Sequence, residues 1–564
     1  MGARHLLIGL DGADLDLVRS LGRKRLPNLH RLMAQGAFAA LRSVQPPATL
    51  PNWTTLLTGV DPGRHGVFDF TTRSGYDVRF TAGSVREAPT IASRLDRMGK
   101  RCACLYFPAT WPPERLEHGV FISGWDAPVA FEADRSFVWP HSLHDEITRR
   151  FGPQRFDDVD EFDADAAGWH ARLPAQLCAR LGRRAELGRW LLESRSWDLF
   201  AIYFGESDTA AHHLWALHDA DSPRRPARVS PQDEGGLARV YTALDTAVGE
   251  LIESAGPDVE VTIASDHGFG GASDKVLYLN RALADAGLLT FARRGLRQRL
   301  VGVAKETALT HLPPRLRERV FRAAGARLPS LLESRARFGP IDMTRTRVFS
   351  DELNYFPALH LNLRGREPSG CVDPAEVEAL VGQVREVLGQ LRDPWHGGPV
   401  VSRVHRREEL FSGPHVERAP DLLLELHLDD GYSYNLMPSG SAPPAGSCAG
   451  AAGSFRRLTP DEYLGRKGRS LQGSHRDRGL FIAHGPAVRV AGEVDAAMAD
   501  VTATLLSRMG VDAGLQLDGV ALDAVLRPHR NPALPLVQAG PMSKPPPADE
   551  GRVARRLRAL GYID

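Results

Sequence analysis

The chain has 564 residues, of which 25% are charged and 43% are hydrophobic, and its 70 basic and 69 acidic residues leave a formal net charge of +1. This is the composition of an ordinary globular protein, and neither charge is in the excess that would favour a nucleic acid polymer or a membrane surface as partner. The length exceeds what one small hydrophobic core supports, so we expect one large domain with insertions, or two domains.

The amino-terminal segment and the cysteines predict a cytoplasmic protein. The first apolar run, residues 6–10, is too short for a signal peptide, and no apolar run reaches the roughly 20 residues that cross a bilayer. The five cysteines are irregularly spaced, and Cys102 and Cys104 do not form a C-x-x-C redox or zinc pair. We therefore interpret the cysteines as reduced thiols in a reducing compartment.

Short apolar runs alternate with amphipathic segments along the chain. The apolar runs predict buried strands at residues 4–10, 101–107, 197–204, 258–265, 420–427 and 479–483, and helical periodicity predicts helices at 88–98, 236–254, 374–392 and 496–509. This alternation favours an α/β fold in which a mixed, mainly parallel sheet is sandwiched by helices. Ligands of such sheets gather at the carboxyl ends of the strands.

Two segments are predicted to be insertions in a catalytic domain that spans residues 1–540. Residues 131–195 contain an acidic run without the spacing of a calcium loop, followed by a helical stretch. Residues 289–340 carry twelve basic against three acidic residues and predict a basic helical cap, which could attract an anionic substrate, touch lipid or simply be solvated. A linker and a short helix, residues 541–564, follow the domain.

Six side chains of metal-binding type lie in four separate segments, and most of them come just after a predicted strand: Asp11, Asp208, His212, Asp266, His267 and His475. Asp208 and His212 are four apart and so share one face of a helix, although a lone pair of this kind is usually a surface pair. Together the six predict two divalent ions with three protein ligands each, which leaves positions open for substrate. Two such ions can clamp the attacking and leaving oxygens of a phosphoryl group.

A candidate nucleophile lies in the segment 46–59. Two prolines stiffen the approach to Thr49, and residues 52–57 predict the start of a helix whose unpaired amide groups favour an anion. The alternative is that Thr49 only caps this helix, as threonine often does.

In chain order, these segments resemble the metal and nucleophile motifs of the alkaline phosphatase superfamily: Asp11-Gly12, Thr49-x-Pro-Asn52, Thr58-Gly-x-x-Pro62-x-x-His65-Gly66, Asp208-x-x-x-His212, Asp266-His267-Gly268 and Gly473-x-His475. Within it, the chain is most similar to the type I phosphodiesterase and nucleotide pyrophosphatase branch, especially to prokaryotic predicted phosphohydrolases or phosphomutases. The resemblance extends from residue 4 to about residue 525. It implies an alkaline phosphatase-like fold with helical cap insertions.

The resemblance also implies a role for each site residue. One zinc ion is expected to be surrounded by Asp11, Thr49, Asp266 and His267, and the other to be held by Asp208, His212 and His475, with Mn²⁺ as an alternative to Zn²⁺. Thr49 is expected to attack phosphorus and form a phosphothreonine intermediate, which water then hydrolyses with net retention at phosphorus. Asn52 is expected to donate a hydrogen bond to a non-bridging oxygen.

The substrate is expected to be a small phosphate ester. A sulfatase is disfavoured, because threonine cannot be converted to formylglycine. Leu50 follows Thr49 where monoesterases often carry an arginine, which favours a diester or a pyrophosphate, unless Arg64 or a cap residue supplies the missing charge. A phosphomonoesterase, a phosphomutase, a phosphotransferase and a non-catalytic metal-stabilised binding protein stay open, as does the oligomeric state.

Departures from the motifs concern the surroundings of the site. Trp53 stands where related phosphodiesterases often carry His or Tyr, so the wall near the leaving group is expected to differ. Arg476 and Arg478 lie beside His475 and are candidates for binding further phosphate oxygens, or for exposed loop positions without that role.

Overall fold

The protein is organised around a nine-stranded sheet. A computed structural model describes residues 2–124, 135–153, 168–292, 334, 337–352, 357–439, 453–464, 471–489, 492–511 and 516–522. The order of the strands in this sheet is β19 (Gly492–Glu493), β2 (Ala37–Arg42), β18 (Arg478–His484), β9 (Glu260–Ala264), β1 (Gly2–Leu10), β8 (Ser196–Phe204), β5 (Cys102–Leu105), β6 (Val120–Ile122) and β7 (Val138–Trp139). The five strands from β9 to β6 run parallel, whereas β18 and β7 pair antiparallel with their neighbours. The mixed, mainly parallel sheet is therefore confirmed.

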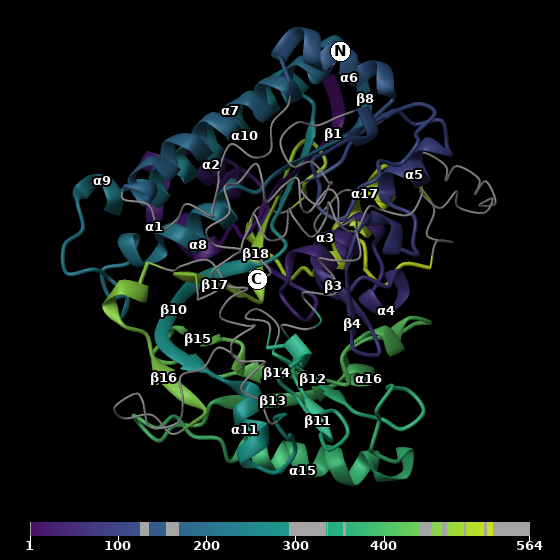
Figure 1. Ribbon diagram of the computed structural model, residues 1–564. Coiled ribbons are helices and arrows are strands. Elements are labelled where there is room, and N and C mark those ends of the chain that lie inside the picture. The colour runs from purple at the N-terminus through teal and green to yellow at the C-terminus, as the bar shows by residue number, and fades with distance from the viewer. Residues whose placement is uncertain are drawn as a thin grey trace.

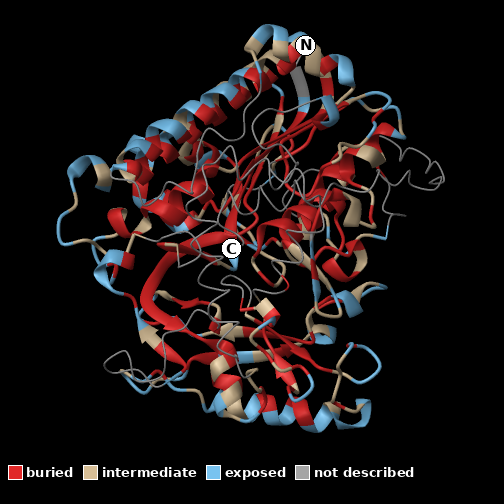
Figure 2. Cartoon of the chain, in the orientation of Figure 1, coloured by how far each residue is buried: buried red, intermediate tan, exposed pale blue. Residues whose placement is uncertain are grey.

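Helices cover both faces of this sheet (Figure 1). One group packs together on one face: α1 (Leu15–Arg25), α2 (Pro27–Gln35), α7 (Trp169–Ser194), α8 (Glu206–His218) and α10 (Gly236–Ala255). The other group comprises α3 (Thr49–Thr58), α5 (Ile91–Asp96) and α17 (Met498–Arg508). A sheet covered on both faces needs nearly continuous apolar strands, and Leu6, Leu7 and Ile8 are completely buried. Figure 2 shows the buried residues concentrated in these layers.

The segment 131–195 contributes to these layers where it is described. β7 is an edge strand of the central sheet, and α7 packs along α10. The helix α6 (His141–Phe151) lies next to β7, and α4 (Pro62–His65) and α9 (Pro231–Glu234) are short helices beside α3 and α8. The described 3₁₀ helices are η1 (Gly83–Val85), η2 (Arg135–Phe137), η4 (Pro374–Glu376), η5 (Val416–Arg418) and η7 (Pro460–Glu462).

A smaller antiparallel sheet forms a second layer system below the first (Figure 1). Its order is β11 (Val348–Phe349), β12 (Ala358–Leu361), β14 (Leu422–Leu426) and β13 (Val401–Arg406). The helices α11 (Leu279–Asp285), α15 (Val377–Gly389) and α16 (Arg407–Leu410) accompany it, and its core includes Leu361, Leu380 and Leu422. The predicted strand 420–427 is thus a buried strand, but it belongs to this sheet and not to the parallel one.

One long strand, β10 (Gly268–Leu277), runs from the centre of the molecule into the lower part (Figure 1). Its first residues pair antiparallel with β17 (Gly473–Arg476). Its last residues pair with β15 (Ser433–Leu436) and β16 (Phe455–Arg457). β10 directly follows His267. It therefore connects the edge of the central sheet with the second layer system.

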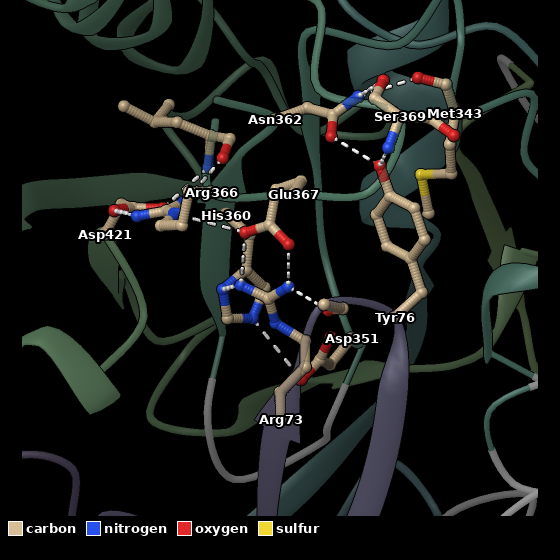
Figure 3. Close-up of polar contacts among 12 residues, drawn as sticks. Arg73, Tyr76, Met343, Asp351, His360, Asn362, Arg366, Glu367, Ser369 and Asp421 are labelled. Atoms are coloured by element: carbon tan, nitrogen blue, oxygen red, sulfur yellow. Dashed lines mark hydrogen bonds and ion pairs between the residues drawn. The ribbon is translucent and has the colours of Figure 1, made fainter. Parts of the chain in front are cut away.

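A hairpin of β3 (Thr71–Ser74) and β4 (Asp77–Phe80) docks on the antiparallel sheet through a polar network (Figure 3). The Arg73 guanidinium donates two hydrogen bonds to the Glu367 carboxylate, at 2.9 and 3.1 Å, and lies 3.2 Å from Nδ1 of His360. The Tyr76 hydroxyl donates to Oδ1 of Asn362 at 2.7 Å. Because the Glu367 side chain is only 1% exposed, its charge depends on Arg73 and on Arg366, whose Nε donates to Oε1 of Glu367 at 3.0 Å.

Several predicted features lie outside the described residues. They include residues 293–333, which make up most of the predicted basic cap at 289–340, and residues 541–564, the predicted linker and terminal helix. The division of the chain into a catalytic domain at residues 1–540, with its insertions, and a linker and helix at residues 541–564 stays a prediction. Within the described ranges, none of the helices combines the length and the apolar character needed to cross a membrane.

Replacing Arg73 with Met should lower the free energy of unfolding by about 3 kcal/mol, because it removes a bidentate partner from a buried carboxylate. Urea unfolding followed by circular dichroism measures the effect. Arg364→Met is the matched control, since Arg364 and its partner Asp373 have side chains that are 66% and 48% exposed, and it should change stability by less than about 0.5 kcal/mol. Equal small effects of both variants would contradict a stabilising role of the Arg73 network.

Candidate metal centre

The order of strands in the central sheet brings three acidic residues to one edge. β9, β1 and β8 are adjacent and parallel. Asp266, Asp11 and Asp208 follow these three strands by one to four residues. Because the carboxyl ends of parallel strands meet at the same edge of a sheet, residues that are more than 50 positions apart in the sequence become neighbours.

Asp11, Asp266 and His267 form one buried cluster. Nε2 of His267 lies 3.4 Å from Oδ1 of Asp11 and 3.3 Å from Oδ2 of Asp266. All three side chains are at most 2% exposed. This is the first of the two ligand groups that the sequence predicts.

Asp208, His212 and His475 form a second buried cluster. Oδ1 of Asp208 lies 3.3 Å from Nε2 of His212 and 3.5 Å from Nε2 of His475, and the two Nε2 atoms are 3.1 Å apart. Asp208 and His212 share one face of α8, as their spacing predicts. His475 comes from β17, and the pairing of this strand with β10 places it opposite Phe269.

The two clusters touch each other. The rings of His267 and His475 are stacked, with centroids 3.5 Å apart and planes inclined by 17°. Nε2 of His267 is 3.9 Å from Oδ1 of Asp208. The six side chains therefore make up one site with two halves.

Backbone carbonyl groups fix the orientation of all three imidazoles. Nδ1 of His212 lies 3.0 Å from the carbonyl oxygen of Gly473, Nδ1 of His267 lies 3.0 Å from that of Gly268, and Nδ1 of His475 lies 2.7 Å from that of Pro47. A carbonyl oxygen can only accept, so each Nδ1 carries a proton, and a neutral ring then has its lone pair on Nε2. This is the arrangement that metal-binding histidines usually show.

The donor atoms fit divalent metal ions. The distances between ligand atoms within each cluster, 3.1–3.5 Å, match the edge of about 3.3 Å expected for a tetrahedron with metal–ligand bonds of about 2.0 Å. Oδ1 of Asp11, Oδ2 of Asp266 and Nε2 of His267 are buried and have no hydrogen-bond partner among the described residues. Lone pairs that face one another in this way repel unless a cation lies between them.

The electrostatics of the site also require added positive charge. Burial raises the pKa of Asp266, and the neighbouring carboxylate of Asp11 raises it further. For Asp208 burial acts in the same direction, but contacts with two histidines outweigh it and hold its pKa well below the usual range. Burial and a neighbouring imidazole lower the pKa of His475 to about 3, so this ring is neutral at physiological pH. Closely packed buried carboxylates with neutral imidazoles are the composition of a divalent-metal site.

Thr49 is the first residue of α3, and the loop before it contacts both clusters. In this loop, Ser43 Oγ donates a hydrogen bond to the carbonyl oxygen of Asp266 at 2.7 Å. The carbonyl oxygen of Pro47 in the same loop accepts a hydrogen bond from Nδ1 of His475. Thr49 is completely buried, and its Oγ1 has no hydrogen-bond partner within the described part of the chain. The N-cap residue of α3 is Ala48. Helix capping therefore does not explain Thr49.

The Asn52 side chain contacts the loop that leads to Thr49. Its Oδ1 accepts from the amide of Val44 at 2.7 Å, and its Nδ2 is within 3.3 Å of the carbonyl oxygens of Val44, Pro46 and Ala48. The Nδ2 group therefore donates to the loop in this arrangement, and its expected hydrogen bond to a non-bridging oxygen stays a prediction. Asn52 holds the loop that leads to Thr49.

Trp53 contacts one of the proposed metal ligands. Its Nε1 donates to Oδ2 of Asp11 at 3.0 Å, and the hydroxyl of Tyr203 donates to the same oxygen at 2.5 Å. Both rings are buried and pack edge-to-face, with centroids 5.3 Å apart. Two donors on Oδ2 turn Oδ1 towards His267. Sequence reasoning missed Tyr203, although a hydroxyl inside the apolar run 197–204 has to find a buried partner.

The arginines considered as phosphate ligands are bound elsewhere. Arg64 donates to Oδ1 of Asp518 at 2.8 Å and to the carbonyl oxygen of Gln516 at 2.7 Å. Arg476 donates to the carbonyl oxygens of Gly271 and Gly431, and Arg478 is exposed at the start of β18. None of these contacts directs the guanidinium group of Arg64 or Arg476 towards the two clusters.

A third group of possible ligands, Asp393, His396 and Asp429, already has a cation. Nζ of Lys275 lies 2.9 Å from Asp393 and 2.7 Å from Asp429. We interpret this group as a buried ion-pair cluster that fastens the end of β10, because a metal ion would have to displace the ammonium group.

Comparison with known proteins identifies the family. The sequence profile of the type I phosphodiesterase / nucleotide pyrophosphatase family matches residues 5–454, whereas a search of curated proteins gives no match. Among solved structures, human ectonucleotide pyrophosphatase / phosphodiesterase 5 has 15% identity and a TM-score of 0.48, and its murine counterpart has 14% and 0.49; each alignment covers 93% of this chain and 100% of the other. The murine protein is also known as an inactive variant in complex with AMP. Because the profile covers well over half of the 564 residues, the chain belongs to the type I phosphodiesterase / nucleotide pyrophosphatase family and is a phosphoric ester hydrolase.

Proposed function

We propose that the protein is a two-metal phosphodiesterase or nucleotide pyrophosphatase that works through a phosphothreonine on Thr49. The observation that carries this proposal is the buried Thr49 Oγ1, which has no hydrogen-bond partner in the described ranges and follows a loop that contacts both ligand clusters. Thr49 and Trp53 are four apart on α3 and so share a face, and the Trp53 indole contacts Asp11. This spacing supports a position of Thr49 on the Asp11 side of the site.

We assign one divalent ion to Asp11, Thr49, Asp266 and His267, and the other to Asp208, His212 and His475. Zn²⁺ suits the mixture of imidazole and carboxylate ligands, with Mn²⁺ as the alternative. When bound, such ions supply positive charge for the attacking and leaving oxygens and lower the pKa of water. The nature of the ion and the cytoplasmic location both stay predictions.

The reaction proposed for Thr49 has two steps. Oγ1 loses its proton and forms a bond to phosphorus while the bond from phosphorus to the leaving oxygen breaks, and the leaving oxygen takes up a proton. Water then attacks phosphorus, the bond to Oγ1 breaks and Thr49 regains its proton. Each step inverts the configuration at phosphorus, so the product has net retention.

A diester or pyrophosphate is favoured over a monoester because a monoester carries one more negative charge at the reacting phosphorus. Leu50, the residue after Thr49, is completely buried in the core. Arg64 and Arg476, which could have supplied the additional charge, are held by other groups. A small ester with one esterified oxygen therefore matches the charges near Thr49 better.

Replacement of Thr49 by Ala should abolish turnover, with a fall of at least about 10³-fold in kcat, while leaving nearly two equivalents of metal bound. The physical reason is that Oγ1 is the nucleophile, whereas the six other ligand side chains remain. Steady-state kinetics and metal analysis of the same preparation measure both quantities. Thr58→Ala, which removes a buried threonine at the other end of α3, is the control, and it should keep its activity. Turnover retained by the Thr49 variant would exclude a phosphothreonine mechanism.

The zinc-loaded protein should hydrolyse bis-p-nitrophenyl phosphate with a higher kcat/KM than p-nitrophenyl phosphate. The reason is the shortage of free cationic groups for a doubly charged monoester. A panel of nucleotide sugars, dinucleoside polyphosphates and glycerophosphodiesters then defines the natural class, and added alcohols reveal any transfer to acceptors other than water. A clear preference for the monoester would overturn the diester assignment.

Trp53→Phe should weaken binding of one equivalent of Zn²⁺ by about 10–100-fold, because Asp11 loses one of the two donors that orient it. Calorimetric titration of the metal-free protein measures this affinity. Trp197→Phe is the matched control, since Trp197 also donates from a buried indole, to the carbonyl oxygen of Leu191, but is not among the side chains of the site. If both substitutions leave both affinities unchanged, the indole does not support the metal site.

A further inference from the structure

Arg224 is completely buried, although it carries a charge and lies in the loop that follows α8. Its Nε donates to the carbonyl oxygen of Tyr463 at 2.9 Å, and its Nη1 donates to that of Leu471 at 2.5 Å. Its Nη2 lies 3.4 Å from the carbonyl oxygen of Glu462. One guanidinium thus binds the main chain at two places that are separated by eight residues.

The main chain bound by Arg224 leads directly to a proposed metal ligand. Leu471 precedes Gln472, and β17 with His475 begins at Gly473. The contact at Leu471 therefore lies four residues before His475. Arg224 itself follows α8, which carries Asp208 and His212, by six residues.

Gln472 completes the connection between these elements. Its amide donates to the carbonyl oxygen of His212 at 2.8 Å, and its Oε1 accepts from the amide of Ala216 at 3.1 Å. Its Nε2 donates to the carbonyl oxygen of Leu464 at 3.1 Å, and its own carbonyl oxygen accepts from Ala272 in β10. Gln472, which is also completely buried, thus joins the same two stretches of chain as Arg224.

We propose that Arg224 is a positioning residue for the cluster of Asp208, His212 and His475. By binding carbonyl groups at residues 462–463 and at Leu471, it fixes where β17 starts relative to α8, and so it sets the 3.1 Å separation between His212 and His475. A guanidinium suits this task because its donors diverge in one plane, whereas a lysine offers one point of charge. This inference rests on the proposed function, since it assumes that the cluster binds a metal ion.

The test is a calorimetric titration of the metal-free, full-length protein with Zn²⁺. Arg224→Met should weaken one of the two equivalents by about 10–100-fold and leave the other unchanged. Arg224→Lys should give a smaller loss. Turnover of bis-p-nitrophenyl phosphate by Arg224→Met should recover as Zn²⁺ is raised, with kcat approaching that of the wild type.

Arg225→Met is the matched control. Arg225 is the next residue in the chain, but it binds Leu217 and Glu234 at the end of α8 and in α9, so its removal should leave both Zn²⁺ affinities unchanged. A purely structural role of Arg224 predicts a lower melting temperature with both affinities unchanged, and that result would overturn the proposal. Failure of both Arg224 variants to fold would also overturn it, because positioning of one cluster leaves the fold intact.

A double variant separates action through His475 from an indirect effect. In a His475→Ala background, Arg224→Met should cause no further loss of Zn²⁺ affinity, and an additive loss would contradict the proposal. The wild-type protein distinguishes this proposal from the proposed function. Binding of two ions without hydrolysis of any phosphate ester would refute the function alone, whereas failure to bind a second ion would refute both.

Discussion

The rest of the site depends on one constraint, namely that three carboxylates and three imidazoles are buried together at one edge of the central sheet. Buried carboxylates are tolerated only where positive charge and hydrogen bonds compensate for the lost water. Here the imidazoles direct their Nε2 atoms to the carboxylates, because their Nδ1 atoms are engaged by carbonyl groups. A divalent cation in each half satisfies both requirements at once, and the ligand distances allow it.

Residues that are not themselves ligands hold these ligands in place through hydrogen bonds. Trp53 and Tyr203 orient Asp11 by hydrogen bonds to its Oδ2, and Arg224 and Gln472 connect α8 with β17. β10 begins directly after the ligand His267 and continues into the antiparallel layer system, where the Lys275 cluster fastens its end. The position of the ligands is therefore linked to the packing of both parts of the molecule.

Confirmed and unconfirmed expectations differ in how they depend on distance along the chain. Asp208 and His212 were predictable as neighbours because four residues make one helical turn, and strands 4–10 and 197–204 because burial on both faces needs unbroken apolar runs. The loop contacts of Asn52 were not predictable, because its partners are carbonyl groups whose direction depends on the path of the loop 44–48. The same applies to Arg476 and Trp53, whose partners come from distant segments.

By itself, the sequence determined the types of ligand, their order and the presence of a threonine nucleophile candidate, since these are properties of local motifs and of hydrophobic periodicity. The family resemblance implied which ligands group together, but only the tertiary structure supplies the physical reason, because the grouping follows from the strand order β9–β1–β8 and from the pairing of β17 with β10. The tertiary structure also decided which polar side chains have hydrogen-bond partners. Thr49 Oγ1 has no hydrogen-bond partner among the described residues, whereas the amide of Asn52 donates to the loop. That difference arises from packing between segments, which no local pattern encodes.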